Sequence, residues 1–178
     1  KDSSFREFVS KDHPTFKPES GRYHLFISYA CPWATRVLAM LHIKGLEDHI
    51  SFSTTHPTWK QTRPGHDEHC GWAFYDSEDP KRIVPTSPAG YGSFDISGCS
   101  IPQSDIVTIP PSLKDEIPSI RFVRDLYDVS MDGQPYDNKF TVPILWDKET
   151  NTIVNNESSE LLRMLDSSFC DFASGEYK

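Results

Sequence analysis

The chain has 178 residues, of which 37% are hydrophobic and 12% aromatic, enough for one domain with a substantial core. The formal net charge of −8 at pH 7 argues against a protein that binds nucleic acid or an anionic membrane nonspecifically. No apolar run approaches the roughly 18 residues that span a bilayer. The cysteines are too few and too widely spaced for a disulfide scaffold, which suits a reducing compartment; they are Cys31, Cys70, Cys99 and Cys170.

The first half of the chain predicts an arm followed by strand, helix and strand. Residues 1–20 are polar and contain two prolines, so we expect an extended arm. The apolar and aromatic run "YHLFISYA" (23–30) predicts a buried strand. A helix is expected from Trp33 to about Lys44, where Gly45 would end it. "HISFSTTHP" predicts a second strand, and this order is typical of a parallel sheet.

Residues 57 to about 117 interrupt this order of strands and helices. They contain most of the prolines and glycines, as in "PTSPAGYGSFDISG" and "TIPPSLKDEIP". A loop of this length inside a compact domain is unusual, so we interpret it as a functional insertion or a partly ordered flap.

Regular patterns return after the insertion. "IRFVRDLYDVS" (120–130) predicts an amphipathic helix, and "FTVPILWD" and "TIVNNE", joined by "KETN", predict a hairpin. "ESSELLRMLDSSF" predicts a last helix with Leu161, Leu162 and Leu165 on its inner face. The order βαβ, insertion, αββα is that of a thioredoxin-like α/β domain with a mixed four-stranded sheet. We place this domain at 21–170, before a tail at 171–178.

Cys31 lies at the predicted junction of the first strand and the first helix. Pro32 suits the first helical position, where a missing N–H costs nothing. The helix end offers unpaired N–H groups and partial positive charge, which favour the thiolate over the thiol. The alternative is a buried structural cysteine. Because position 34 is alanine, Cys31 lacks a neighbour for a local disulfide, and it should instead form a mixed disulfide with an external thiol.

Pro143 stands inside a predicted strand, where a proline removes a ladder donor. If the Val142–Pro143 bond is cis, it turns the backbone groups of Val142 outward, where an extended peptide could pair with them. An ordinary edge-strand proline is the alternative.

Glu157 and Ser158 stand at the start of the last predicted helix. N–H groups at that end can bind a carboxylate, and an acidic side chain there can hold an ammonium group. Together they would fit the end group of an α-amino acid. A simple cap formed by Ser158 or Asn156 is the alternative.

"HPTWKQTRPGHDEHC" contains possible zinc ligands, namely His56, His66, His69 and Cys70. Their spacing is irregular and lacks a CxxC or HxxxH partner. An exposed polar loop is the preferred interpretation, and we expect no metal.

The segments "RYHLFISYACPWATR", "GWAF", "VRDLYD" and "FTVPILWDKETNTIVNNESSELLRML" together resemble the glutathionyl-hydroquinone reductases, the Xi-class glutathione transferases related to the omega class. The resemblance covers most of the chain outside the arm and residues 76–117. It implies a thioredoxin-like domain that binds glutathione as co-substrate and acts on quinone-derived small molecules.

By motif position, the resemblance makes Cys31 the catalytic cysteine. It implies a glutathione site made of Trp72, Arg124, Val142, Pro143, Glu157 and Ser158, in which Val142 is the backbone clamp and Pro143 its cis-proline. From the residues alone, Trp72 would be a core aromatic and Arg124 a surface cation.

The implied reaction begins when the Cys31 thiolate attacks the sulfur of a glutathionyl-hydroquinone. The hydroquinone leaves, and a second glutathione resolves the mixed disulfide. The family is expected to protonate the departing ring carbon with tyrosine hydroxyls from an all-helical C-terminal domain, which also carries much of a homodimer interface.

Only "CDFASGEYK" follows "LLRMLDSSF", so we expect that helical domain to be absent from this chain. The alternative function is therefore a non-catalytic module that binds glutathione or a protein. The expected location is the cytoplasm or the interior of a plastid or other organelle.

Overall fold

A computed structural model of the chain describes residues 3–74, 102 and 104–175. The elements in chain order are β1 (Tyr23–Ile27), α1 (Pro32–Ile43), β2 (Ser51–Thr54), β3 (Lys60–Gln61), β4 (Cys70–Gly71), the 3₁₀ turn η1 (Pro111–Leu113), α2 (Val123–Ser130), β5 (Ile144–Asp147), β6 (Thr152–Asn155) and α3 (Ser158–Ser167). The order βαβ, insertion, αββα predicted from the sequence is confirmed.

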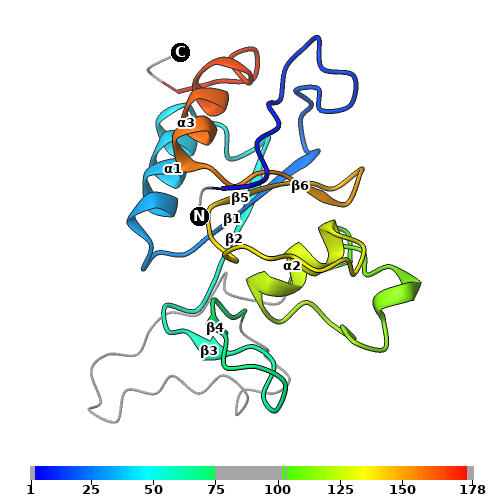
Figure 1. Ribbon diagram of the computed structural model, residues 1–178. Helices are drawn as coiled ribbons and strands as arrows, with labels where there is room; N and C mark the ends of the chain where they lie inside the picture. The colour runs from blue at the N-terminus through cyan, green and yellow to red at the C-terminus, as the bar shows by residue number, and fades with distance from the viewer. Residues whose placement is uncertain (1–2, 75–101, 103, 176–178) are drawn as a thin grey trace.

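The central sheet has the strand order β2-β1-β5-β6. β1 runs parallel to β2 and antiparallel to β5, and β5 forms an antiparallel hairpin with β6. α1 and α3 lie together on one face of this mixed sheet, and α2 lies against the other (Figure 1). Because helices cover both faces, every residue of β1 is buried.

α1 begins and ends where the sequence indicates. Its buried face consists of Ala34, Val37, Leu38 and Leu41. Gly45 adopts φ +60° after the last turn. Its N–H donates to His42 O, and the N–H of Leu46 donates to Leu41 O, the pair of bonds that defines a Schellman motif.

Some boundaries and one inner-face residue differ from the predictions. β1 ends at Ile27 rather than at residue 30, because the chain turns there and the Cys31 N–H donates to Ser28 O. α2 begins at Val123 rather than at residue 120, since the Asp125 carboxylate accepts the N–H groups of Arg121 and Phe122 at 2.8 Å each. In α3, Met164 is buried on the inner face, whereas Leu162 is only half-buried.

The described parts of residues 57–117 pack on the domain. β3 and β4 pair in a short antiparallel hairpin. Farther along, Val107, Leu113 and Ile117 are buried in the core, and Trp146 Nε1 donates to Ile106 O at 2.9 Å. Residues 75–101 and 103, which include Cys99, lie outside the described residues. The boundaries of the insertion stay a prediction.

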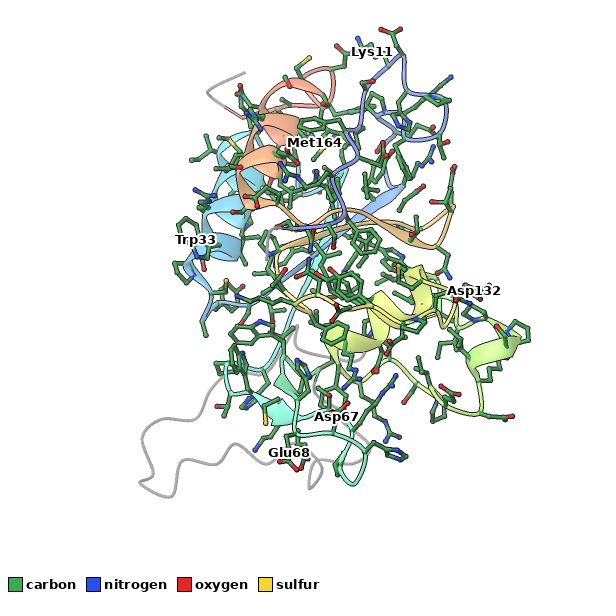
Figure 2. All side chains as sticks on the ribbon, in the orientation of Figure 1. Lys11, Trp33, Asp67, Glu68, Asp132 and Met164 are labelled. Atoms are coloured by element: carbon green, nitrogen blue, oxygen red, sulfur yellow. The ribbon has the colours of Figure 1, made fainter. Side chains whose placement is uncertain are left out.

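The predicted arm lies along β6 and α3. Arg6 forms an isolated antiparallel bridge with Asn155, and the Glu7 N–H donates to Val154 O at 3.1 Å. Met164 faces this segment from α3 (Figure 2), and its sulfur accepts the N–H of Val9. The arm therefore covers the outer edge of the sheet. No helix in the described part of the chain has the length and apolar character needed to cross a membrane.

Candidate functional site

Cys31 is the N-cap residue of α1. Its backbone is extended (φ −106°, ψ 110°), and Pro32 occupies the first turn. The Cys31 carbonyl accepts N–H bonds from Ala34 and Thr35 at 3.1 and 2.9 Å, whereas its side chain caps nothing. The half-buried sulfur therefore lies at the positive end of the helix. This placement is the one that the sequence predicts.

Val142 lies beside Cys31 although 111 residues separate them. The Cys31 Sγ is 3.7 Å from the Val142 carbonyl oxygen, so the thiol can donate to it. The Val142–Pro143 bond is cis, as the sequence allowed, and β5 begins at the next residue. The cysteine and the proposed backbone clamp are therefore neighbours.

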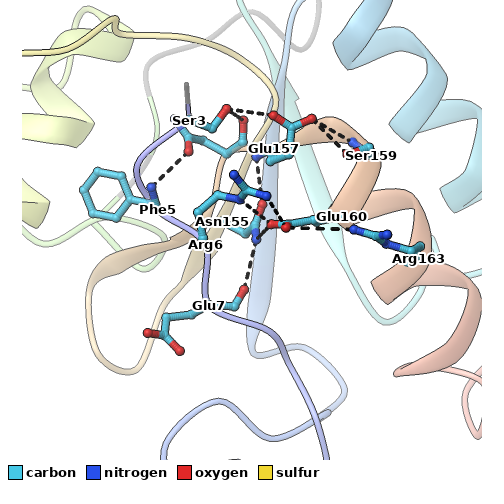
Figure 3. Close-up of polar contacts among 10 residues, drawn as sticks. Ser3, Phe5, Arg6, Glu7, Asn155, Glu157, Ser159, Glu160 and Arg163 are labelled. Atoms are coloured by element: carbon cyan, nitrogen blue, oxygen red, sulfur yellow. Dashed lines mark hydrogen bonds and ion pairs between the residues drawn. The ribbon is translucent and has the colours of Figure 1, made fainter. Parts of the chain in front are cut away.

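Glu157 and Ser158 mark the N-terminal end of α3. Glu157, rather than Ser158 or Asn156, is the N-cap, and its carboxylate accepts from the Ser159 N–H at 3.2 Å. Its other oxygen accepts from the hydroxyl of Ser3 in the arm at 3.0 Å (Figure 3). Partial burial acts to raise the pKa of Glu157, but these hydrogen bonds outweigh it and lower the pKa. The carboxylate is therefore anionic at neutral pH.

Two contacts to this pair of residues were not predicted from the sequence. Ser3 approaches Glu157 from the arm, and Arg36 Nη2 on α1 donates to Ser158 Oγ at 2.5 Å. Ser3 and Glu157 are 154 residues apart, so no local pattern could have indicated their contact. Arg36 lies five residues after Cys31, and its position on the helix that begins at the cysteine was the available signal.

Trp72 and Arg124 lie near the start of α2. The Trp72 carbonyl accepts the Val123 N–H at 2.9 Å, and its indole packs edge-to-face on Trp59 at 5.4 Å. Arg124 Nη1 donates to Asp67 Oδ2 at 2.6 Å, and this bond holds the pKa of Asp67 below its usual value. Among the described residues, no hydrogen bond joins Cys31 to Trp72 or Arg124.

Thr141 connects the Val142 segment to α2 and, through Tyr127, to the start of α3. It directly precedes Val142, and its carbonyl accepts from the Tyr127 hydroxyl of α2 at 2.9 Å. Asn156, directly before Glu157, donates to the same Tyr127 hydroxyl at 2.9 Å. The guanidinium of Arg124 lies 5.1 Å from the ring centre of Phe140, next to Thr141. This network fixes the Val142 segment against both α2 and the start of α3.

Two open cavities of about 340 and 300 Å³ lie beside α2. Asp125 and Phe122 line the first, and Arg124 and Phe140 line the second. Neither is lined by Cys31, Val142 or Glu157. The Cys31 sulfur, the N-terminal end of α1 and the Val142 carbonyl nevertheless converge at one place.

Two of the possible zinc ligands have other side-chain partners. His69 Nδ1 lies 2.9 Å from Thr62 Oγ1, and the Thr58 N–H donates to His56 Nδ1 at 3.1 Å. Within the described ranges, no three His, Cys, Asp or Glu side chains come together as a metal site would require.

Comparison with known proteins gives the family. Residues 30–168 match the family model described as "Glutathione S-transferase, N-terminal domain". Glutathione S-transferase omega-like 2 of Saccharomyces cerevisiae is 38% identical over 190 residues, covering 99% of this chain and 48% of that protein. Glutathionyl-hydroquinone reductase PcpF of Sphingobium chlorophenolicum is 35% identical, covering 91% of this chain and 39% of its own length.

Solved structures agree with these matches. The Xi glutathione transferase ECM4 from Saccharomyces cerevisiae in complex with glutathione has a TM-score of 0.71 at 36% identity, over 99% of this chain and 48% of that one. The glutathione-bound structure of YqjG from Escherichia coli K-12 has a TM-score of 0.65 at 32% identity, over 98% and 47%.

The chain spans about half the length of the relatives that it matches. The match nevertheless includes Cys31, the Val142–Pro143 bond and the start of α3. The chain thus belongs to the glutathione S-transferase family, as an N-terminal, thioredoxin-like domain similar to Xi-class and omega-like members.

Proposed function

We propose that this chain is the glutathione-binding part of a glutathione-dependent thiol transferase that reduces glutathionyl-hydroquinones through Cys31. The observation that carries the proposal is the Cys31 sulfur at the N-terminal end of α1, 3.7 Å from the carbonyl oxygen of Val142. The similarity to proteins named glutathionyl-hydroquinone reductase, from Sphingobium chlorophenolicum and Escherichia coli, supports the choice of substrate.

Glutathione would lie between Cys31 and the start of α3. Its cysteinyl backbone pairs with Val142, whose carbonyl accepts from the Cys31 thiol when the tripeptide is absent. Its γ-glutamyl end reaches Glu157 and Ser158, where the anionic carboxylate faces the ammonium group. Trp72 and Arg124 enclose the tripeptide from the side of α2.

The reaction has two steps, a thiolate attack on the sulfur of an aryl thioether and then a thiol–disulfide exchange. The Cys31 thiolate attacks the glutathione sulfur, the bond from sulfur to the aromatic carbon breaks, and that carbon takes a proton to give the hydroquinone. In the family, a tyrosine hydroxyl of the helical domain would donate this proton. A second glutathione thiolate then attacks the mixed disulfide, releasing oxidised glutathione and the Cys31 thiolate. The two electrons gained by the ring come from two glutathione sulfurs, the thioether sulfur of the substrate and the thiol of the second glutathione.

An assay with a glutathionylated hydroquinone tests the proposal. We expect release of hydroquinone together with oxidised glutathione, and we expect Cys31→Ser to abolish turnover while nearly preserving glutathione binding. Cys170→Ser, at an exposed cysteine in the C-terminal segment, is the matched control and should keep full activity. Turnover that survives Cys31→Ser refutes the nucleophile. Binding of glutathione without turnover in the unaltered protein favours the non-catalytic module.

A further inference from the structure

Arg36 joins α1 to the first residue of α3. Its Nη2 donates to Ser158 Oγ at 2.5 Å, across 122 residues of sequence. Arg36 is half-buried, and Ser158 is only 6% exposed. The guanidinium lies 4.7 Å from the ring centre of Trp33, which projects from the outer side of α1 (Figure 2). The indole thus fixes the arginine from one side, and the serine fixes it from the other.

The direction of this hydrogen bond determines what Ser158 can do. A guanidinium only donates, so the Ser158 oxygen is the acceptor. The hydroxyl hydrogen is then left to donate to another group. Because Ser158 is the first residue of α3, that group meets the positive end of the helix dipole. A serine held in this way is suited to bind an anion.

The charges around Arg36 favour the same ligand. Among the described residues, Arg36 forms no ion pair with a carboxylate, whereas Arg6, Arg22, Arg63 and Arg124 each do. Glu157, adjacent to Ser158, is hydrogen-bonded by Ser3 and Ser159 instead. A cation without an ion-pair partner among the described residues and an anionic carboxylate therefore both lie next to Ser158, one through a hydrogen bond and one in sequence. This arrangement is complementary to an α-amino-acid zwitterion.

We propose that Arg36 is a positioning residue for the α-carboxylate of the γ-glutamyl group: it holds the Ser158 hydroxyl in the donating orientation and supplies the positive charge that the carboxylate needs. The proposal rests on the glutathione site proposed above and adds to it a residue of α1. Arg36 thus couples the helix that carries Cys31 to the end of the tripeptide farthest from the sulfur.

The affinities of three variants for two ligands test this role. The ligands are glutathione and its analogue in which the γ-glutamyl α-carboxylate is a carboxamide. The variants are Arg36→Met, Arg36→Lys and the control Arg163→Met, since Arg163 lies on α3 with 67% of its side chain exposed. Calorimetry gives each Kd, and thermal unfolding reports whether each variant is folded.

The unaltered protein should prefer glutathione to the carboxamide. Arg36→Met should weaken glutathione binding about tenfold, the size of a lost hydrogen bond to a charged group, and should leave the carboxamide nearly unaffected. Arg36→Lys should recover part of the preference because it restores the charge. Arg163→Met should behave like the unaltered protein. In turnover, Arg36→Met should raise the KM for glutathione and spare kcat, since Cys31 is unchanged.

Equal weakening of both ligands, or no weakening of either, would overturn the role of Arg36 and leave the glutathione site intact. If Arg36→Met does not fold, Arg36→Lys is compared with the unaltered protein instead. The proposal is then overturned if Arg36→Lys keeps both the same Kd for glutathione and the same preference for glutathione over the carboxamide. Failure of the unaltered protein to bind glutathione refutes the proposed function itself, and this inference with it.

Discussion

At the scale of single residues, burial and hydrogen bonding shift the pKa of Asp125 in opposite directions, and burial has the larger effect. Its carboxylate accepts two backbone N–H groups just before α2, which favours the anion. Burial nevertheless dominates and raises the pKa of Asp125 from 3.8 to about 6. The helix start therefore contains a carboxyl group that opposes folding when it is ionised.

We predict that Asp125→Asn removes a pH dependence of stability. Because the folded-state pKa is raised, the stabilising contribution of the protonated form is complete below pH 3.8 and is lost as the pH rises through about 6. Relative to Asp125→Asn, the free energy of unfolding of the unaltered protein should fall by about 2–3 kcal/mol between pH 4 and pH 7. Both N–H bonds go to one oxygen, so the asparagine carbonyl can accept them. Urea unfolding of both proteins across this range is the measurement, and parallel pH profiles would show that the carboxyl group is not buried as described.

At the scale of elements, the ends of α1 and α3 are held by contacts from distant segments. The arm carries Arg6, which donates through two nitrogens to the buried carboxylate of Glu160 on α3, with Nε 2.7 Å from Oε2 (Figure 3). The C-terminal segment crosses the end of α1, where the N–H of Gly175 donates to Lys44 O at 2.9 Å. Both segments stabilise the face of the domain that carries Cys31.

Arg6→Met should lower the free energy of unfolding by about 1–2 kcal/mol. It leaves the Glu160 carboxylate, with 8% exposure, the hydrogen bond from Asn155 and a 3.9 Å ion pair with the exposed Arg163. Half of the arginine is exposed, so solvent screening keeps the effect below that of a fully buried pair. The hydrogen bonds from Arg6 lower the pKa of Glu160, so the difference should be present above the usual glutamate pKa and vanish as the pH falls below it. Lys11→Met, which breaks an exposed pair with Asp171, is the control and should leave the free energy of unfolding nearly unchanged. Equal losses in chemical unfolding would contradict docking of the arm.

Gly45→Ala should destabilise the protein more than Gly21→Ala does. Both glycines have positive φ, so both substitutions strain the backbone by about 1 kcal/mol. A Cβ at Gly45 would also lie 2.5 Å from Ser174 Oγ and 2.7 Å from Gly175 N, whereas one at Gly21 meets nothing within 4 Å. Displacing the C-terminal segment should add at least about 1 kcal/mol to the cost at Gly45. Equal shifts in thermal unfolding would indicate that this segment does not dock.

At the scale of the whole molecule, the strand and helix order could be predicted because it depends on local patterns. The apolar run of β1, the proline after Cys31 and Gly45 after α1 each set an element or its end through nearby residues. The β3–β4 hairpin escaped prediction because its strands have two residues each, too few to show alternation.

The site also contains features that short motifs predict and contacts that only the fold creates. The positions of Cys31, the cis Val142–Pro143 bond and the helix start at Ser158 follow from short motifs. The contacts of Ser3 with Glu157 and of Arg36 with Ser158 join segments more than 120 residues apart, and only the folded chain brings them together. The roles of Trp72 and Arg124 in binding glutathione stay a prediction from the family resemblance.

The most direct test of the account is to map the thiols that react with oxidised glutathione. Cys31 should form a mixed disulfide at neutral pH, releasing one glutathione thiolate, and S-methylglutathione should protect it by occupying the same groove. Peptide mass spectrometry should place the adduct on Cys31 well before it appears on Cys70 or Cys170, although both of these are more exposed. An adduct shared evenly among the three cysteines, or no protection by S-methylglutathione, would contradict a nucleophile placed beside a glutathione site.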